Sequence, residues 1–179
     1  MSASLALLML AAAPDLGAAA PAFATFDAVC ARADTVDVAG ERATAEGWSE
    51  FEPEKNSPLG YIVGVTRAFG GPEGDRSFRR DDGSINIWVR RTIPAPMGQF
   101  VECKVYDFAV AEVPPRAALV AWAGGKPSSV VEISGDIALG WDKADGSMVL
   151  VSIQTPPCFV AGKCQASRLV IERSVAVKP

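Results

Sequence analysis

From residue 61 onward the chain is rich in hydrophobic residues that alternate with polar ones, a period of two that is typical of half-buried β-strands. In segment 84–93 the aliphatic residues Ile85, Ile87 and Val89 stand at every second position, and segment 100–110 repeats the pattern. Other segments are short runs of β-branched and aliphatic residues bounded by turn formers. We therefore predict strands at 61–69, 84–93, 100–110, 128–134, 136–143, 147–155 and 167–177.

A helical period precedes these strands. Phe26, Val29, Cys30 and Ala33 occupy positions i, i+3, i+4 and i+7. One face of a helix would therefore carry the apolar side chains together with the cysteine.

A second short helix is expected directly afterwards. Asp34 and Thr35 have side chains that can cap its start, and Glu46 is its expected last residue. Gly47 suits the left-handed position that ends a helix, and Trp48 would then fold back onto the last turn.

The run RAALVAWA at 116–123 predicts one further short helix, because two prolines precede it and two glycines follow it. Residues 50–58 and 70–83 are rich in Pro, Gly and charged side chains and indicate loops. The tripeptide at 144–146, Ala-Asp-Gly, indicates a hairpin turn between two strands.

These elements predict an α+β fold in which the N-terminal helix or helices and a second short helix pack on one face of an antiparallel sheet. A length of 179 residues suits a single domain, and no repeat or linker divides the chain. Hydrophobic residues make up 49% of the chain and charged residues 21%, which excludes a disordered protein.

The first 24 residues predict a signal peptide. An apolar run extends from Leu5 to about Ala13, and the later Ala22-Phe23-Ala24 fits the small-residue pattern of a cleavage site. The run is shorter than the roughly 20 apolar residues of a membrane anchor. We therefore expect residues 1–24 to be removed and residues 25–179 to form an exported domain without a membrane span, periplasmic or secreted. Because no Lys or Arg precedes the run, a buried N-terminal helix is the alternative.

Export determines how the cysteines are interpreted. In an oxidising compartment Cys30, Cys103, Cys158 and Cys164 predict two disulfide bonds. A zinc site would need all four thiolates, because the chain has no histidine, and the first two cysteines are too far apart for a close ligand pair. A redox pair would be expected as C-x-x-C, which does not occur. We predict that Cys30 pairs with Cys103 and Cys158 with Cys164; bridges from Cys30 to either C-terminal cysteine are the alternatives.

The absence of histidine removes many catalytic arrangements, among them the Ser-His-Asp triad, the Cys-His pair and the H-E-x-x-H zinc helix. The sequence also contains no G-x-S-x-G elbow and no phosphate-binding P-loop. We therefore expect neither a cofactor nor a metal, and we expect a protein that is not an enzyme. A hydrolase that uses two carboxylates is the enzymatic alternative.

Positive charge is concentrated in one part of the chain. Six of the eleven arginines lie between Arg67 and Arg91, together with four acidic residues. Arginine binds carboxylates and phosphates through paired hydrogen bonds. The candidate anion-binding residues are Arg76, Arg79, Arg80 and Arg90. The alternative is a solvated loop in which arginines and neighbouring acidic residues pair with each other.

The net charge of the whole chain is −4, which excludes a general nucleic-acid binder, since such a protein needs a basic face. The abundance of Ala, and of Arg over Lys, favours a bacterial source. The sequence favours a non-catalytic binding or accessory module of the cell envelope with an anionic partner, such as a glycan, a lipid headgroup or an acidic protein. A structural or stress-related exported protein is the second interpretation, and the carboxylate-based hydrolase is the third.

Overall fold

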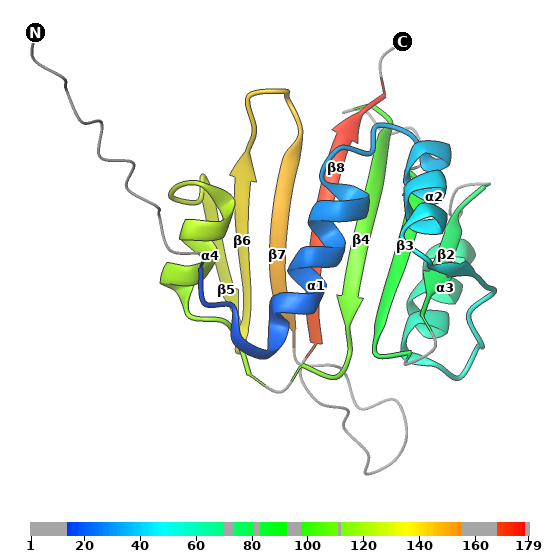
Figure 1. Ribbon diagram of the computed structural model, residues 1–179, viewed down its shortest axis with the longest axis horizontal. Coiled ribbons are helices and arrows are strands. Elements are labelled where there is room, and N and C mark those ends of the chain that lie inside the picture. Colours follow the sequence, from blue (N-terminus) through cyan, green and yellow to red (C-terminus); the bar gives the residue numbers. More distant parts are fainter. Residues whose placement is uncertain are drawn as a thin grey trace, which may run out of the picture.

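The computed structural model describes residues 14–69, 74–80, 83–92, 98–110, 112–154 and 168–177. In these residues eight strands form one antiparallel sheet in the order β1-β2-β3-β4-β8-β7-β6-β5 (Figure 1). The strands are β1 Ser49–Glu50, β2 Arg76–Arg79, β3 Ile85–Arg91, β4 Phe100–Asp107, β5 Ser129–Ile133, β6 Asp136–Asp142, β7 Met148–Gln154 and β8 Arg168–Ala176. Two meanders, β1–β4 and β5–β8, meet where β4 pairs with β8.

Helices precede each of the two meanders and interrupt the first. They are the 3-10 turn η1 Gly17–Ala19, α1 Ala20–Thr25, the π-helical turn η2 Phe26–Cys30, α2 Val36–Ala45, α3 Pro58–Ala68 and α4 Arg116–Ala123. Figure 1 shows α1 and α2 lying across one face of the sheet. The α+β fold predicted from the sequence is confirmed.

The sheet has a buried layer on each face. The larger core lies between the sheet and α1, η2, α2 and α4, and it includes Phe23, Phe26, Ile87 and Val151. A smaller cluster lies on the other face, where Trp88, Tyr106 and Val170 contact residues of α3. The predicted helices pack on one face of the sheet, as expected. Helix α3, which the sequence did not predict as a helix, covers the other face, where β3, β4 and β8 also carry apolar residues.

Most of the predicted elements are confirmed. Strands β3 to β8 lie at the predicted segments, and α4 spans the predicted residues 116–123. Thr35 caps α2, because its hydroxyl accepts a hydrogen bond from the Val38 backbone N–H at 3.1 Å. Gly47 has a φ of +78°, and the Trp48 N–H donates to the carbonyl oxygen of Ala43 at 2.9 Å, as expected for this helix end.

Two segments differ from the prediction. Residues 61–68 of the predicted strand 61–69 belong to α3, and Phe69 is its C-terminal cap. The Ser57 hydroxyl accepts a hydrogen bond from the Gly60 N–H, and Pro58 occupies the first helical turn, so a capped start outweighs the β-branched composition. Residues 76–79, within the predicted loop, form β2, whose Phe78 pairs with Ile87 and is fully buried.

The first predicted disulfide is confirmed, and the second falls on residues that the structure does not describe. Cys30 on η2 and Cys103 on β4 are bonded, with 5.4 Å between their Cα atoms, and the bond joins the helical layer to the sheet. Cys158 and Cys164 lie outside the described residues, so their pairing stays a prediction.

The expected cleavage point after Ala24 falls inside α1. Leu16, Ala19, Ala22 and Phe23 precede that point and are buried in the larger core. The apolar run at 5–13 lies outside the described residues, so the signal peptide and its removal stay a prediction.

Candidate functional site

The four candidate arginines do not form one anion-binding loop. Two of them are neutralised by carboxylates: Arg76 makes two hydrogen bonds to Glu50, at 3.0 and 2.7 Å, and Arg90 donates to Glu102 at 2.7 Å. The hydrogen bond from Arg76 is the main reason why the pKa of Glu50 lies below its usual value. For these two positions the interpretation as paired charges is the better one.

Arg79 and Arg80 are neighbours in the sequence but lie on opposite faces of the sheet. The Cζ atom of Arg79 lies 4.6 Å from the centroid of the Phe51 ring, on the face that carries α3. The Cζ atom of Arg80 lies 4.7 Å from the centroid of Trp48, on the face that carries α1 and α2. Both are exposed, and neither forms an ion pair with a carboxylate among the described residues.

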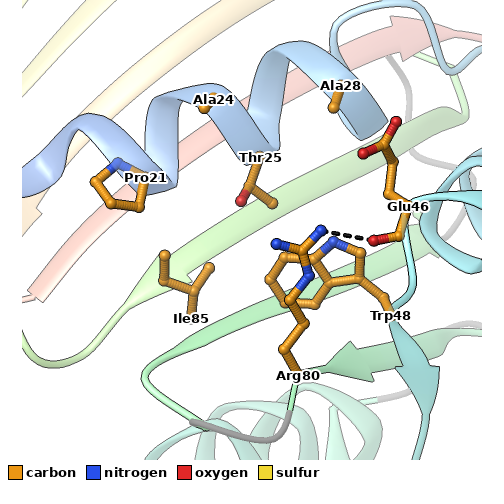
Figure 2. A pocket seen from close by; sticks show the side chains of 8 residues that line it. All are labelled: Pro21, Ala24, Thr25, Ala28, Glu46, Trp48, Arg80 and Ile85. Atoms are coloured by element: carbon orange, nitrogen blue, oxygen red, sulfur yellow. Dashed lines mark hydrogen bonds between the residues drawn. The ribbon is translucent and has the colours of Figure 1, made fainter.

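Arg80 lies in a pocket of about 340 Å³ between the N-terminal helical segment and the edge of the sheet (Figure 2). Pro21, Ala24, Thr25 and Ala28 form the wall on the helical side. The facing side consists of Glu46, Trp48, Arg80 and Ile85. We call these eight residues the Arg80 pocket.

Local structure holds Arg80 and Trp48 in place. The end of α2 buries Trp48 against the core and turns the carbonyl oxygen of Glu46 outward, where Arg80 Nη2 donates to it at 2.6 Å. Arg80 itself begins the turn after β2, in which its carbonyl accepts from Gly83 N–H at 3.0 Å. One guanidinium N–H is therefore anchored, the ring of Trp48 supports the cation, and the other N–H donors have no acceptor among the described residues.

Thr25 places a hydroxyl group in the same pocket. Thr44 and Thr66 each donate their hydroxyl to the carbonyl four residues earlier in the helix, at 3.0 and 2.9 Å. The Thr25 hydroxyl has no such bond within the described part of the chain, although the residue is only 8% exposed. Figure 2 shows its side chain on the side of α1 that looks toward Arg80.

A second pocket, of about 420 Å³, lies at the other side of η2 and contains two carboxylates, Asp27 and Asp145. Burial raises the pKa of Asp27, and a hydrogen bond from Trp122 Nε1 at 3.2 Å offsets part of that rise. The pKa of Asp145 is about 2, because it accepts hydrogen bonds from Ser147 and from Arg173. The Asp145 carboxylate therefore makes structural contacts. Asp27 is the carboxylate in this pocket whose pKa is raised.

Among the described residues, no group of three or more Cys, Asp and Glu side chains is placed to hold a metal ion. No helix in the same part of the chain is both long and apolar enough to span a membrane. Comparison of the chain with models of protein families, with curated proteins and with solved structures finds no match in any of the three.

The sequence singles out Arg80 but not all of the residues that line its pocket. The sequence predicts Trp48 as a contact at the end of α2, and that contact is what presents its ring to Arg80. Thr25 has no distinguishing pattern, because its role depends on how α1 packs beside β3. The pattern Gly-Trp at a helix end is the single useful indication.

Proposed function

We propose that this protein is an exported, non-catalytic binding module that holds an anionic group of its partner in the Arg80 pocket. The supporting observation is the setting of Arg80: its guanidinium is oriented by the Trp48 ring and by the Glu46 carbonyl, in a pocket, without a described carboxylate partner. A cation held in place by neutral groups keeps its charge available for a ligand.

The pocket favours a small group with one anionic end. Its volume of about 340 Å³ is at the lower end of the range for small-molecule sites. Arg80 and the Thr25 hydroxyl can both donate to a carboxylate or phosphate oxygen, while Pro21, Ala24 and Ala28 offer apolar contact to the remainder. A carboxylate or phosphate group of an envelope component, or an acidic side chain of a protein, fits these walls.

The disulfide bond supports export. Stable disulfides form in oxidising compartments such as the periplasm and the cell exterior and are rare in the cytosol. The Cys30–Cys103 bond joins two elements that are distant in the sequence, as in structural disulfides. We therefore propose a periplasmic or secreted location.

The first prediction tests the pocket with two neighbouring substitutions. Titration with inorganic phosphate and with acetate, followed by NMR of the tryptophan indole N–H groups, should show saturable shifts at Trp48. Arg80→Ala should weaken this binding about tenfold or more, because a charge-assisted hydrogen bond contributes about 1.5–3 kcal/mol. Arg79→Ala removes the same charge on the other face of the sheet and is the matched control, with binding unchanged.

The outcomes separate a site from general electrostatics. Thr25→Val, which keeps the shape of the side chain, should also weaken binding, by a smaller factor. Equal losses in the two arginine variants would indicate non-specific attraction and would contradict the proposal. No shift with either anion in the unaltered protein would leave the structural or stress-related interpretation as the better one.

A further inference from the structure

The two edges of the sheet are built differently. At one edge β1 has only two residues, and its Glu50 is tied to Arg76. At the other edge β5 has five residues, Ser129–Ile133, and all of them are exposed. Val130, Val131 and Ile133 are 43%, 49% and 66% exposed. A long apolar edge strand invites pairing with another strand, and soluble proteins usually protect such edges.

The hairpin between β5 and β6 determines which backbone groups of this edge are free. Ile133 pairs with Asp136 across a two-residue turn, in which Ser134 and Gly135 have φ angles of +52° and +90°. In such a hairpin the pair next to the turn is hydrogen-bonded, and hydrogen-bonded pairs recur at every second residue. The backbone N–H and C=O groups of Val130 and Glu132 therefore face away from the sheet.

We propose that β5 pairs antiparallel with β5 of a second copy of this chain, with the two-fold axis at Val131. In this register Val130 and Glu132 of one copy lie opposite Glu132 and Val130 of the other, so both outward-facing residues form hydrogen-bonded pairs. Two sheets would then join into one continuous sheet across the dimer, related by the symmetry that is commonest among homo-oligomers.

Charge excludes one neighbouring register, and the pairing of Ile133 disfavours the other. A shift that centres the axis on Glu132 places the two glutamates directly opposite each other, which is unfavourable. A shift that centres it on Val130 leaves Glu132 opposite Ser128 and moves Ile133 beyond the end of the paired region. With the axis at Val131, the two Val131 side chains meet, and Ile133 lies opposite Ser129.

The occupant is a second copy because the strand is complementary to itself. It contains one charge, Glu132, and the antiparallel register places that charge opposite an aliphatic residue rather than opposite a like charge. The contact is a single pair of five-residue strands, which is small beside the interfaces of stable dimers. The dimer should therefore appear as protein concentration rises.

Two substitutions at Val130, one to a positively charged and one to a negatively charged residue, test the register. Sedimentation velocity at protein concentrations from about 10 µM to about 1 mM should show a reversible dimer, because small interfaces are weak. Val130→Lys places a lysine opposite Glu132 of the second copy, twice by symmetry, and should tighten the dimer roughly three- to tenfold. Val130→Glu should weaken it by a similar factor, and both effects should shrink in high salt.

Cross-linking tests the same register independently. In a non-hydrogen-bonded antiparallel pair the Cα atoms lie about 4.5 Å apart, which suits a disulfide. Val131→Cys should therefore form an intermolecular disulfide on mild oxidation, detected by peptide mapping. In the control Glu132→Cys, the two introduced cysteines are not opposite each other. They are displaced by two residues, about 7 Å, along the strand direction, so no bond should form.

Three results would overturn the proposal. A monomer at every concentration excludes the contact. A dimer that responds equally to both Val130 substitutions, or that cross-links in the Glu132→Cys variant rather than in the Val131→Cys variant, uses another surface or register. A monomer whose β5 amide resonances shift only when an extended peptide of another protein is added would show that the edge serves a different partner.

Discussion

Several charged side chains of the sheet have an oppositely charged neighbour among the described residues. Lys104 lies between Glu102 and Glu172, at 3.0 and 2.9 Å; burial lowers its pKa, but the two carboxylates outweigh burial and raise it. Arg173 is 4% exposed and contacts Asp34 and Asp145. Against this background Arg80, which is held by a ring and a carbonyl, is the residue in which we expect charge to serve a ligand.

Asp27 supplies a test of charge burial at a single residue. Burial raises the pKa of Asp27 above its usual value, so the ionised carboxylate reduces the free energy of unfolding at neutral pH. Asp27→Asn keeps an acceptor for Trp122 Nε1 and should stabilise the protein at pH 7. The difference should vanish as the pH falls below about 4, where the carboxyl group is protonated in the folded and the unfolded state.

Urea denaturation of the unaltered protein and of the Asp27→Asn variant at several pH values measures this difference in the free energy of unfolding. Asp145→Asn is the contrasting variant, because the pKa of Asp145 is lowered to about 2. That substitution should destabilise the protein at pH 7, and its effect should fade as the pH approaches 2. A destabilised Asp27→Asn protein at neutral pH would show that the hydrogen bond with Trp122 outweighs burial.

Helix α3 shows how one element depends on a close backbone contact. The carbonyl oxygen of Glu54 accepts hydrogen bonds from the N–H and the hydroxyl of Ser57, at 2.8 and 2.7 Å. This geometry brings the carbonyl against the first turn of α3, where a Cβ atom on Gly60 would lie only 1.8 Å from it. The start of the helix therefore requires glycine, although glycine is a poor helix former.

Two glycines of the same helix make a matched pair. Gly60→Ala should lower the free energy of unfolding by about 1–3 kcal/mol, because the clash exceeds the gain in helix propensity. Gly64→Ala adds a Cβ with no atom within 4 Å and should raise it by about 0.5–1 kcal/mol. Chemical denaturation distinguishes them. Equal effects would mean that the Glu54 carbonyl moves away at little cost.

The molecule as a whole places the N-terminal segment at the centre of its helical layer. Leu16, Ala19, Ala22 and Phe23 are buried, and η2 continues α1 to the disulfide at Cys30. Pro21 and Ala24 also form part of the Arg80 pocket. Removal of residues 1–24 would take away these contacts, so the packing favours a mature chain that begins upstream of Leu16.

Two chains that differ only in the position at which they begin test this arrangement. A protein that begins at Pro14 should be more stable than one that begins at Thr25 by at least about 3 kcal/mol, the usual cost of losing one buried phenylalanine. Mass spectrometry of the protein from an envelope extract should show an N-terminus upstream of Leu16. An N-terminal Thr25 together with equal stability would instead assign α1 to a removed leader.

Most of the elements were predictable, because they depend on neighbours in the sequence. The alternation of β3 and β4, the cap at Thr35, the Gly47–Trp48 helix end and the span of α4 each involve residues a few positions apart. The pairing of Cys30 with Cys103 followed from two local patterns, each of which placed a cysteine on an apolar face.

The features that depend on contacts between distant parts of the chain were decided by the tertiary structure. Arg79 and Arg80 look equivalent in the sequence, and only the pairing of β2 with β3 sends them to opposite faces. Burial against Trp88 and Tyr106 stabilises α3 as a helix, and the fit of α1 beside Ile85 makes a pocket around Arg80. The sequence by itself determined most of the segments that form secondary structure. Packing decided that residues 61–68 form a helix and residues 76–79 a strand, and it decided which arginines pair with carboxylates, because charge pairing and burial depend on residues far apart in the chain.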